Sequence, residues 1–340
     1  MKVSTRSCPK VYIGIVLPKK LIGVTMPPKR YLAIIAVLSS LLLVAFIMPV
    51  TCEEKPVIIA TTTVLGSVVQ DLAGDSVELH VVVSPAICPA HYDVKPSDVY
   101  VFSKASVILY HGFEPWITGL YEASGSKAKL VKISGSWSTP DGIKKYYQEV
   151  ASALREELGL DVSDKLKETL EKIDSVAGEI RSRADKLGVS DVKVITMKWQ
   201  EEFVKWVGFN VAADFGPPEK LSSADVDKLV EIGKNERVTL VISNLQSGTK
   251  FGESLAAEIG AVHVVLSNFP WSDPEAKTLM DLMKRNADEL FKATELYDVK
   301  VTALELQRML ELYQTLTYCL IALVIVEAAL LVYLIRRIRS

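Results

Sequence analysis

The sequence has few of the residues and motifs on which most enzymes and small secreted scaffolds depend. Its 340 residues include only four cysteines and four histidines. Cys8 lies in a basic leader and Cys319 in an apolar run, so Cys52 and Cys88 alone remain for a folded exterior, which excludes a disulfide scaffold. The sequence contains no Gly-rich phosphate loop, His-Glu-x-x-His, Gly-x-Ser-x-Gly or paired Cys-x-x-Cys. We therefore expect neither an enzyme nor a catalytic cofactor.

Charge is distributed unevenly along the chain, although the net charge is only −2. The first 30 residues carry lysines and arginines but no acid, and three arginines follow residue 335. The region between is therefore acidic, which speaks against nucleic-acid binding because that function needs a basic face. An acidic surface suits a cation ligand, but solubility alone also explains a diffuse negative charge.

Two long apolar runs lie near the ends of the chain. Residues 31–50 carry no charge and follow Lys29 and Arg30, whereas residues 315–335 carry only Glu327 and precede the three arginines. Each run has about 20 residues, which is enough to span a bilayer. Because basic flanks favour the cytoplasmic side, both chain ends are predicted inside the cell. The intervening region is then an anchored, extracytoplasmic module at the cell membrane.

Residues 1–30 form a basic leader that has no place in this arrangement. Met26 and the Pro-Pro-Lys-Arg that follows it read as a complete basic start of a signal segment, so translation from Met26 is an alternative to translation from Met1. Residues 31–52 are then a signal sequence or an uncleaved N-terminal anchor. Cys52 invites a lipoprotein interpretation, but residues 49–51 lack the small side chains expected before a lipidated cysteine.

Strand-like and helix-like segments alternate between the two apolar runs. Such alternation predicts parallel sheets that are covered by helices. We expect a first α/β lobe at residues 55–162 and a second at residues 190–292. The expected strands are 57–60, 77–83 and 106–109 in the first lobe, and 192–197, 209–213, 238–242 and 261–266 in the second.

Long helices are expected between and after the lobes. Apolar residues at steps of three and four predict one helix over residues 163–187, which would join the lobes rigidly. Residues 273–292 are expected to close the second lobe as a helix. Residues 293–314 read as a helical linker with a capping box at Thr302 and Glu305, and residues 315–335 as a transmembrane helix.

The segment from Cys88 to Asp98 is rich in groups that bind metals and runs from a strand into a helix. With the segment from Ser106 to Trp116, it resembles the zinc and manganese receptors of ABC importers, a family of metal-binding solute-binding proteins. The family signature reads Asp-Pro-His-x-Tyr-Glu-Pro-x-Pro-Ser-Asp. The chain keeps Pro89, Tyr92, an acid at Asp93, and the Pro-Ser-Asp of residues 96–98.

This resemblance covers about residues 55–292 and implies the same fold, two α/β lobes joined by one long helix. It also implies a transition-metal ion as the transported ligand, with an ABC permease and its ATPase as partners. The usual metal ligands are replaced, however. The residues that stand in their places are Ala90, Gly135, Met197 and Ser267, and Asn244 falls where the family carries a glutamate or a nearby polar group.

The positions of the histidines point to a crevice between the lobes. Ligands of open parallel sheets bind beyond the carboxyl ends of the strands. His91 and His111 follow expected strands and should lie on that side. His80, within a strand, and His263, near the start of one, are interpreted as structural.

Two interpretations of the crevice remain open. In one, a metal site is rebuilt from His91, His111, Cys88 and Met197, a soft ligand set that suits zinc or copper. In the other, Cys88 and Met197 are packing residues, and the histidines bond the backbone of loops. For Cys88 and Met197 singly we favour packing, and for the two histidines together we favour metal binding.

The sequence therefore predicts an extracytoplasmic solute-binding protein of an ABC importer, which captures zinc, manganese or a softer transition-metal ion for delivery to a permease. The alternative is a membrane-anchored interaction or sensory module that keeps the fold and has lost metal binding. Replacement of the family ligands at Ala90, Gly135, Met197 and Ser267 is the feature that supports this alternative.

Overall fold

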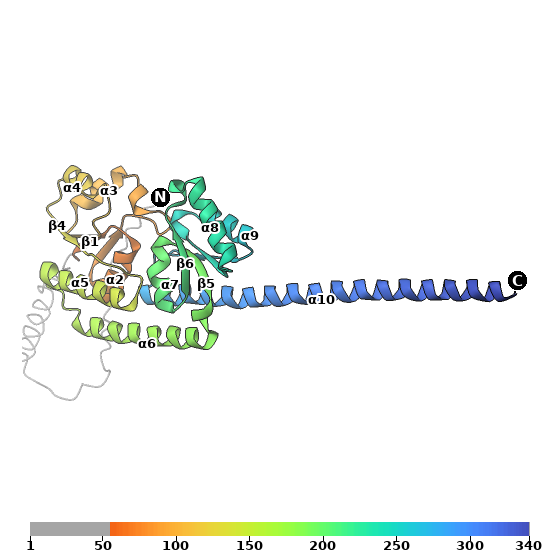
Figure 1. Cartoon of the computed structure of the whole chain (residues 1–340). Coiled ribbons are helices and arrows are strands. Elements are labelled where there is room, and N and C mark those ends of the chain that lie inside the picture. Colours follow the sequence, from red (N-terminus) through yellow and green to blue (C-terminus); the bar gives the residue numbers. More distant parts are fainter. Residues whose placement is uncertain (1–54, 340) are drawn as a thin grey trace, which may run out of the picture. The chain divides into compact units, whose positions relative to one another are not determined.

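The computed structural model describes residues 55–339, which contain two α/β lobes (Figure 1). The expected leader and the expected N-terminal signal or anchor, residues 1–52, lie outside the described residues. Each lobe is built on a sheet of four parallel strands, with the order β2-β1-β3-β4 in the first and β6-β5-β7-β8 in the second. The expected two-lobed α/β fold is thus confirmed.

The first lobe places its most apolar strand, β1, between two neighbours. Ile58 lies opposite Leu79 of β2 and Val107 of β3. Helices α2 and α5 pack against each other, and the residues of α3 and α4 enclose a separate apolar cluster around Phe102. The elements are β1 (Val57–Ala60), α2 (Thr63–Ala73), β2 (Glu78–Val81), α3 (Pro96–Ser103), β3 (Val107–Tyr110), α4 (Ile117–Ser124), β4 (Lys129–Lys132) and α5 (Pro140–Leu158), with short 3-10 helices at Gly74–Ser76 and Pro89–His91.

The second lobe repeats this plan around β5 and β7. Both strands are almost completely buried, as expected for central parallel strands covered on two faces. Its elements are β5 (Lys193–Met197), α7 (Glu201–Val207), β6 (Asn210–Phe215), α8 (Ser223–Asn235), β7 (Leu240–Asn244), α9 (Lys250–Ile259) and β8 (Val262–Leu266), with short 3-10 helices at Val189–Asp191, Lys198–Gln200, Pro218–Lys220 and Leu245–Ser247. Ser222 caps α8 in a capping box with Asp225.

Helix α6 (Ser163–Leu187) has the bounds that the sequence predicts and ends at Gly188 in the left-handed conformation, with φ 63°. It packs on α5 of the first lobe and on α10. One cluster of buried apolar side chains runs from Ile58 and Tyr147 through Ile173 to Leu240 and Phe291. The two lobes therefore share a continuous core in addition to their covalent link.

Helix α10 (Leu279–Arg339) is a single helix of 61 residues (Figure 1). It begins six residues later than the expected helix at residue 273, at a capping arrangement in which Thr278 Oγ1 accepts from the Asp281 amide at 3.1 Å. The predicted capping box at Thr302 is wrong. Thr302 lies inside the helix, where its hydroxyl donates to the carbonyl of Asp298, because no Gly or Pro interrupts the chain from Leu279 onward.

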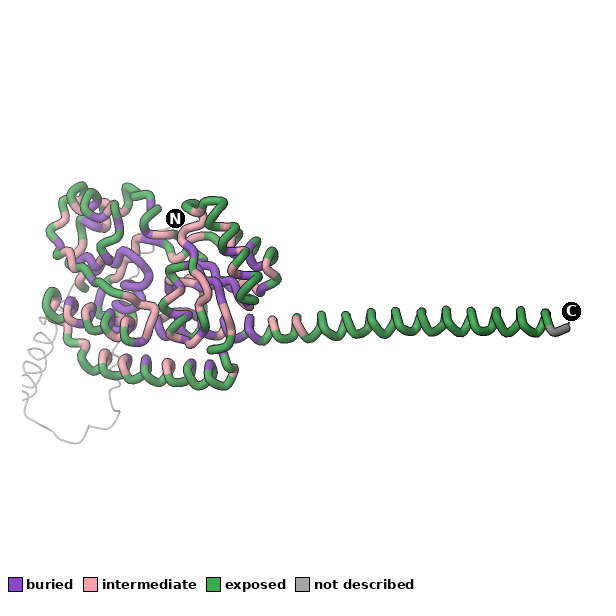
Figure 2. Tube along the Cα trace, viewed as in Figure 1, coloured by how far each residue is buried: buried purple, intermediate pink, exposed green. Residues whose placement is uncertain are grey.

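The part of α10 beyond Val301 is exposed as far as Arg337, the last residue whose burial is described. Figure 2 shows the helix as buried only at its start and exposed from Glu295 onward, apart from the half-buried Tyr297 and Val301. Its apolar stretch is long enough, and apolar enough, to cross a membrane by length and composition. Residues 315–335 belong to this stretch.

Candidate interlobe site

The loops at the carboxyl ends of the strands meet between the two lobes. Trp137, after β4, donates from Nε1 to the carbonyl of Asn268 at 2.9 Å, and its ring stacks on Phe269 with centroids 6.3 Å apart. Gln246, after β7, donates from Nε2 to the carbonyl of Pro85 at 2.9 Å. The strand ends of the two lobes therefore face each other, as parallel-sheet topology predicts, and protein groups bridge the region between them.

His111 lies at the end of β3 and is 5% exposed. Its Nε2 lies 2.7 Å from Thr62 Oγ1 and its Nδ1 lies 2.9 Å from the Tyr146 hydroxyl. Because the Tyr146 hydroxyl donates to the carbonyl of Gly135 at 3.2 Å, it accepts from Nδ1–H, and Nε2 then accepts from Thr62. Both ring nitrogens are occupied, so His111 has no lone pair free for a metal in this arrangement.

The charge state of His111 follows from its burial. Desolvation lowers the pKa of His111 to about 4, against the opposing effect of the Glu114 carboxylate. The imidazole is therefore neutral at physiological pH, which agrees with one ring nitrogen donating and the other accepting. Burial also raises the pKa of Tyr146, which keeps its hydroxyl protonated as the donor to Gly135.

Glu114 holds the loop that carries His111 in place. Its carboxylate accepts from the amides of His111 at 3.0 Å and Gly112 at 2.7 Å, and from the Thr61 hydroxyl at 2.5 Å. Burial acts to raise the pKa of Glu114, but these donors outweigh it and keep the pKa below its usual value. A buried carboxylate that accepts three hydrogen bonds from protein groups stabilises the local structure, and here it holds the loop in place.

An aromatic cluster fills the space beside His111. Its members are His111, Phe113, Trp137, Tyr146 and Phe269. The ring of His111 stacks on Phe113 with centroids 4.9 Å apart and lies 4.9 Å from Trp137. Gly135, which stands in the place of a family histidine, adopts φ 126° and contributes its carbonyl to this network. The first-lobe side of the crevice is thus packed with rings.

Cys88 and His91 lie at the two ends of one 3-10 turn in the loop after β2. His91 is exposed and Cys88 is half-buried. The same loop is fixed at Pro89, whose carbonyl accepts from Trp116 Nε1 at 2.9 Å, and at Tyr92, whose hydroxyl donates to Asp98 at 2.8 Å. His91 is therefore on a well-anchored loop and its side chain is accessible.

Met197 ends β5, as expected, but its side chain is 1% exposed and belongs to the apolar core between the second sheet and helices α8 and α9. Its neighbours in that core include Phe215, Leu229 and Leu255. The structure thus separates Met197 from the aromatic cluster. Of the four predicted ligands, only Cys88 and His91 share one local segment.

The second-lobe side of the crevice is a network of amides and hydroxyls. Gln246 Nε2 also donates to Ser267 Oγ at 3.0 Å, and Gln246 Oε1 accepts from the Asn268 amide at 3.1 Å. Asn286 of α10 exchanges two hydrogen bonds with the backbone of Ser267. Ser267 therefore binds protein groups through both its side chain and its backbone.

A small cavity of about 20 Å³ lies between the lobes, beside Trp137, Gln200 and Ser267. That volume holds about one water molecule. Gln200 is 2% exposed, and its Nε2 has no hydrogen-bond partner among the described residues. Within residues 55–339 there is no group of three or more His, Cys, Asp or Glu side chains that could together hold a metal ion.

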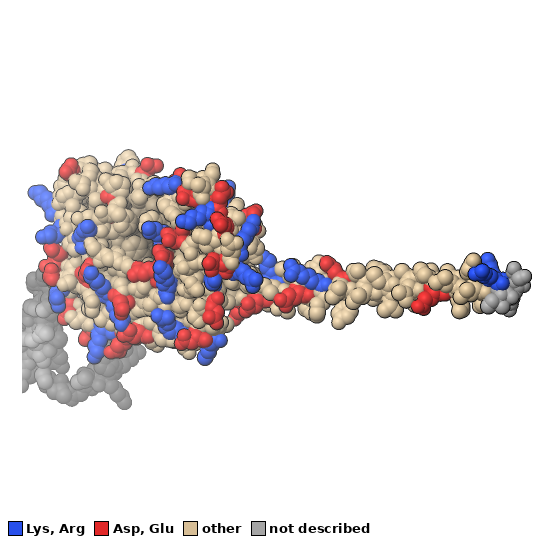
Figure 3. All heavy atoms as spheres, viewed as in Figure 1, with Lys and Arg blue, Asp and Glu red and all other residues tan. Residues whose placement is uncertain are grey.

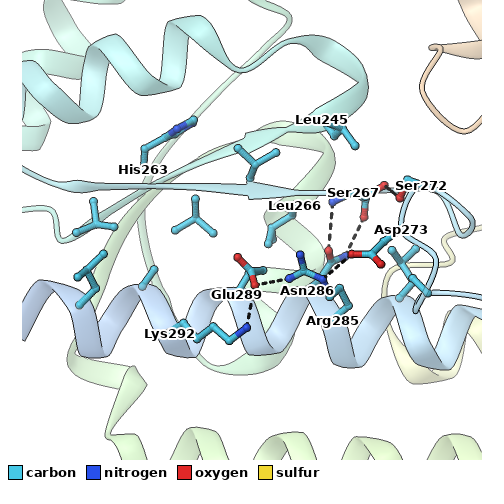
Figure 4. A pocket seen from close by; sticks show the side chains of 17 residues that line it. Leu245, His263, Leu266, Ser267, Ser272, Asp273, Arg285, Asn286, Glu289 and Lys292 are labelled. Carbon is cyan, nitrogen blue, oxygen red and sulfur yellow. Dashed lines mark hydrogen bonds and ion pairs between the residues drawn. The ribbon is translucent and has the colours of Figure 1, made fainter.

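A larger pocket, of about 510 Å³, lies within the second lobe, between β8 and α10 (Figure 4). Its polar wall consists of internally paired groups, since Arg285 Nε donates to Asp273 at 3.0 Å and Glu289 accepts from Lys292 at 3.3 Å. None of the predicted ligands lines this pocket.

Several residues that organise the region between the lobes were not predicted from the sequence. Thr62, Glu114, Tyr146 and Gln246 organise the interlobe region, yet none belongs to the motif from Cys88 to Asp98. Three consecutive threonines after β1, at residues 61–63, are the one local signal, because buried hydroxyls at a strand end need partners. Glu114 bonds the nearby amides of His111 and Gly112, whereas the contacts of Tyr146 and Gln246 join residues far apart in the chain.

Curated relatives match part of the chain. The manganese ABC transporter substrate-binding lipoprotein of Streptococcus pneumoniae serotype 4 is 29% identical over 105 residues, which is 29% of this chain and 33% of that protein. The metal ABC transporter substrate-binding lipoprotein of Streptococcus mutans serotype c is 29% identical over 129 residues, 36% of this chain and 41% of that protein. The alignments thus span well under half of these relatives.

Solved structures share the fold over most of the described region. The periplasmic zinc-binding protein of Treponema pallidum superposes with a TM-score of 0.61 at 16% identity, covering 71% of this chain and 99% of that one. A manganese-bound periplasmic metal-binding protein of Candidatus Liberibacter asiaticus gives 0.62 at 16% identity, covering 71% and 100%. At this identity the likeness shows the fold alone.

The model of the zinc-uptake complex component A family, described as periplasmic, matches residues 58–293, from β1 into the first part of α10. This match takes in both lobes and the linking helix, the same region in which the sequence resembles metal receptors. The chain belongs to this family of substrate-binding proteins of metal ABC transporters, which are not enzymes.

Proposed function

We propose that the chain is the extracytoplasmic solute receptor of an ABC importer and that its partners are a permease and its ATPase. The family match over residues 58–293 supports this, as do the names of the curated relatives. The apolar part of α10 supplies a membrane tether at the carboxyl end of the receptor. Such a tether would keep the lobes at the membrane surface, next to the permease.

We further propose that the two lobes close on each other without a metal ion. The observation that carries this proposal is the bridging of the lobes by protein groups, since Gln246 donates to the carbonyl of Pro85 across the crevice. Within the first lobe, the two ring nitrogens of His111 are held by Thr62 and Tyr146. Ser267 is likewise bonded to Gln246, and Trp137 crosses the crevice to Asn268. A metal ion bound by His111 or Ser267 would have to displace the bonds of that side chain, each of which contributes about 1 kcal/mol net.

Metal capture through a rebuilt site remains the second candidate. The exposure of His91, one 3-10 turn from Cys88, favours it, because an imidazole and a thiol on one turn are a starting pair of soft ligands. In this proposal His111 and Met197 would complete the site only after rearrangement. His111 would have to release Thr62, and Met197 would have to leave the second-lobe core.

Calorimetry on the full chain in detergent separates the two candidates. Zn(II), Mn(II) and Cu(I) are titrated into the wild type and into His91→Ala, Cys88→Ser and His111→Gln. Metal-independent closure predicts no heat of specific binding in any of the four proteins. Specific binding by the wild type that is weakened at least tenfold in His91→Ala and Cys88→Ser would establish the rebuilt site instead.

A further inference from the structure

The part of α10 that leaves the second lobe carries an apolar seam with the period of a coiled coil. The seam is defined by its a positions, Leu296, Ala303, Leu310, Thr317, Val324 and Leu331, and its d positions, Val299, Leu306, Tyr313, Leu320, Glu327 and Leu334. All are apolar except Thr317 and Glu327. The pattern is read from Leu296 to Tyr313, where most of the other positions are polar, and it continues in register into residues 315–335, where nearly every position is apolar. Apolar residues that recur every 3.5 residues are typical of helices that supercoil around a partner.

The seam is unpartnered in the isolated chain. Val299 is 66% exposed and Leu306 58% exposed, and the other large apolar seam residues are exposed to a similar extent. Figure 3 shows the outer part of the helix as largely uncharged surface, with charged groups near the lobe and arginines at the far end. The seam begins at Leu296, because the preceding a and d positions are the charged Glu289 and Lys292.

The lobe occupies the opposite side of the helix. Leu290, Thr294, Tyr297 and Val301 follow one another at steps of four, three and four, and all are buried or half-buried. At about 100° per residue this stripe lies roughly half a turn around the helix from the seam. A helix that packed on the seam would therefore meet no part of the lobe that the stripe contacts.

We propose that the partner of this seam is the same helix of a second copy, packed in parallel. A second copy has the same membrane orientation and presents the same heptad register both outside and within the bilayer. Glu295 at a g position and Lys300 at the next e position carry opposite charges, and g and e residues of a parallel pair face each other across the interface. Both side chains are exposed, and Lys300 Nζ donates to the carbonyl of Gly260 at 3.1 Å in the single chain, a bond that pairing with Glu295 would replace.

The two polar seam residues fit the same arrangement. An isolated carboxylate within the bilayer costs several kcal/mol. In a parallel pair, Glu327 of each copy lies in one d layer, where a protonated carboxyl group donates to the other, and Thr317 lies in an a layer with its counterpart. The dimer would thus give both polar groups a hydrogen-bonding partner that lipid does not offer.

Disulfide cross-linking of the full chain in membranes tests the dimer, in a background in which Cys8, Cys52, Cys88 and Cys319 are serine. Seam variants Leu306→Cys and Val324→Cys are compared with Arg308→Cys and Val326→Cys, which lie off the seam at nearly the same depth. We expect a product with the mass of two chains at the seam positions, formed at least tenfold faster than at the matched positions.

A second variant separates the seam from chance collision. Leu306→Asp with Leu310→Asp should reduce cross-linking through Val299→Cys at least tenfold, whereas Arg308→Asp should leave it unchanged. All three altered side chains are exposed, so the lobes should fold normally. Equal products on both faces, no product at the seam, or a product with the mass of one chain plus a different protein would overturn the proposal. The outcome does not depend on what the crevice binds.

Discussion

Burial of His111 should make the stability of the protein fall as the solution becomes acidic. The pKa of His111 is lowered by burial to about 4, whereas an unfolded histidine titrates near 6.5. Between these values the unfolded chain binds a proton that the folded chain does not, so the free energy of unfolding decreases as pH falls from about 6.5 to about 4. His111 therefore contributes stability above that window and loses it within the window.

The magnitude follows from the same two pKa values. One pKa unit corresponds to about 1.4 kcal/mol, so the full shift amounts to about 3 kcal/mol, of which about 2 kcal/mol is lost between about pH 7 and about pH 5. The assay is denaturant unfolding of the full chain in detergent, followed by tryptophan fluorescence at both pH values. Trp137 lies against the His111 ring and reports on this region directly.

The comparison variant is His111→Gln, which can still hydrogen-bond to Thr62 and Tyr146 but does not titrate. It should be less stable than the wild type at neutral pH and should lose about 2 kcal/mol less between the two pH values. His263→Gln is a second comparison, because His263 is half-buried, bonds Ser243, and has a pKa that burial also lowers, so its replacement should reduce the pH dependence in the same direction. An unchanged pH dependence in His111→Gln would refute the reasoning.

Three further predictions concern stability and are measured by denaturant unfolding. Trp137→Ala should lower the free energy of unfolding by about 3 kcal/mol because it removes the ring between the lobes. Trp137→Phe should lower it by about 1 kcal/mol through loss of the hydrogen bond to Asn268, and equal losses in the two variants would contradict a role for that bond. Gly66→Ala should lower the free energy of unfolding by about 1–3 kcal/mol, because its new methyl group would lie 2.5 Å from a side-chain carbon of Val81. Gly178→Ala, whose new methyl group would have no atom within 4 Å, should instead raise it by up to about 1 kcal/mol by stabilising α6. Ser222→Ala should cost about 1 kcal/mol through loss of the α8 cap, and Ser223→Ala, one residue further on, should cost less.

The fold was predictable from the sequence wherever the determining signal is local. The bounds of α6 follow from apolar periodicity and a terminal glycine, and seven of the eight strands follow from short apolar segments. Strand β4 was not among the expected strands, because its two apolar residues lie between lysines. The capping box predicted at Thr302 failed because the same residue pattern also occurs inside long helices. Only the absence of a helix breaker from Leu279 onward distinguishes the two cases.

The crevice was predictable in position but not in chemistry. Strand ends placed His91 and His111 on the expected side, yet the state of His111 depends on Thr62 and Tyr146, which are 49 and 35 residues away. Met197 ends its strand as predicted, but the alternation of side chains along β5 directs it into the α8 and α9 core. The strand that a residue ends can thus be predicted from the sequence, but the groups that its side chain contacts cannot.

The most direct test of metal-independent closure is the distance between the lobes in the full chain, measured by single-molecule fluorescence energy transfer. Dyes are attached through non-natural amino acids at Lys127 and Lys228, which are both exposed and lie in different lobes, so that Cys88 stays in place. The Trp137→Ala variant serves as the control for a loosened crevice. We predict one high-transfer population in the presence of a chelator, unchanged when Zn(II), Mn(II) or Cu(I) is added. A low-transfer population in chelator that moves to high transfer with any of these ions would contradict the account.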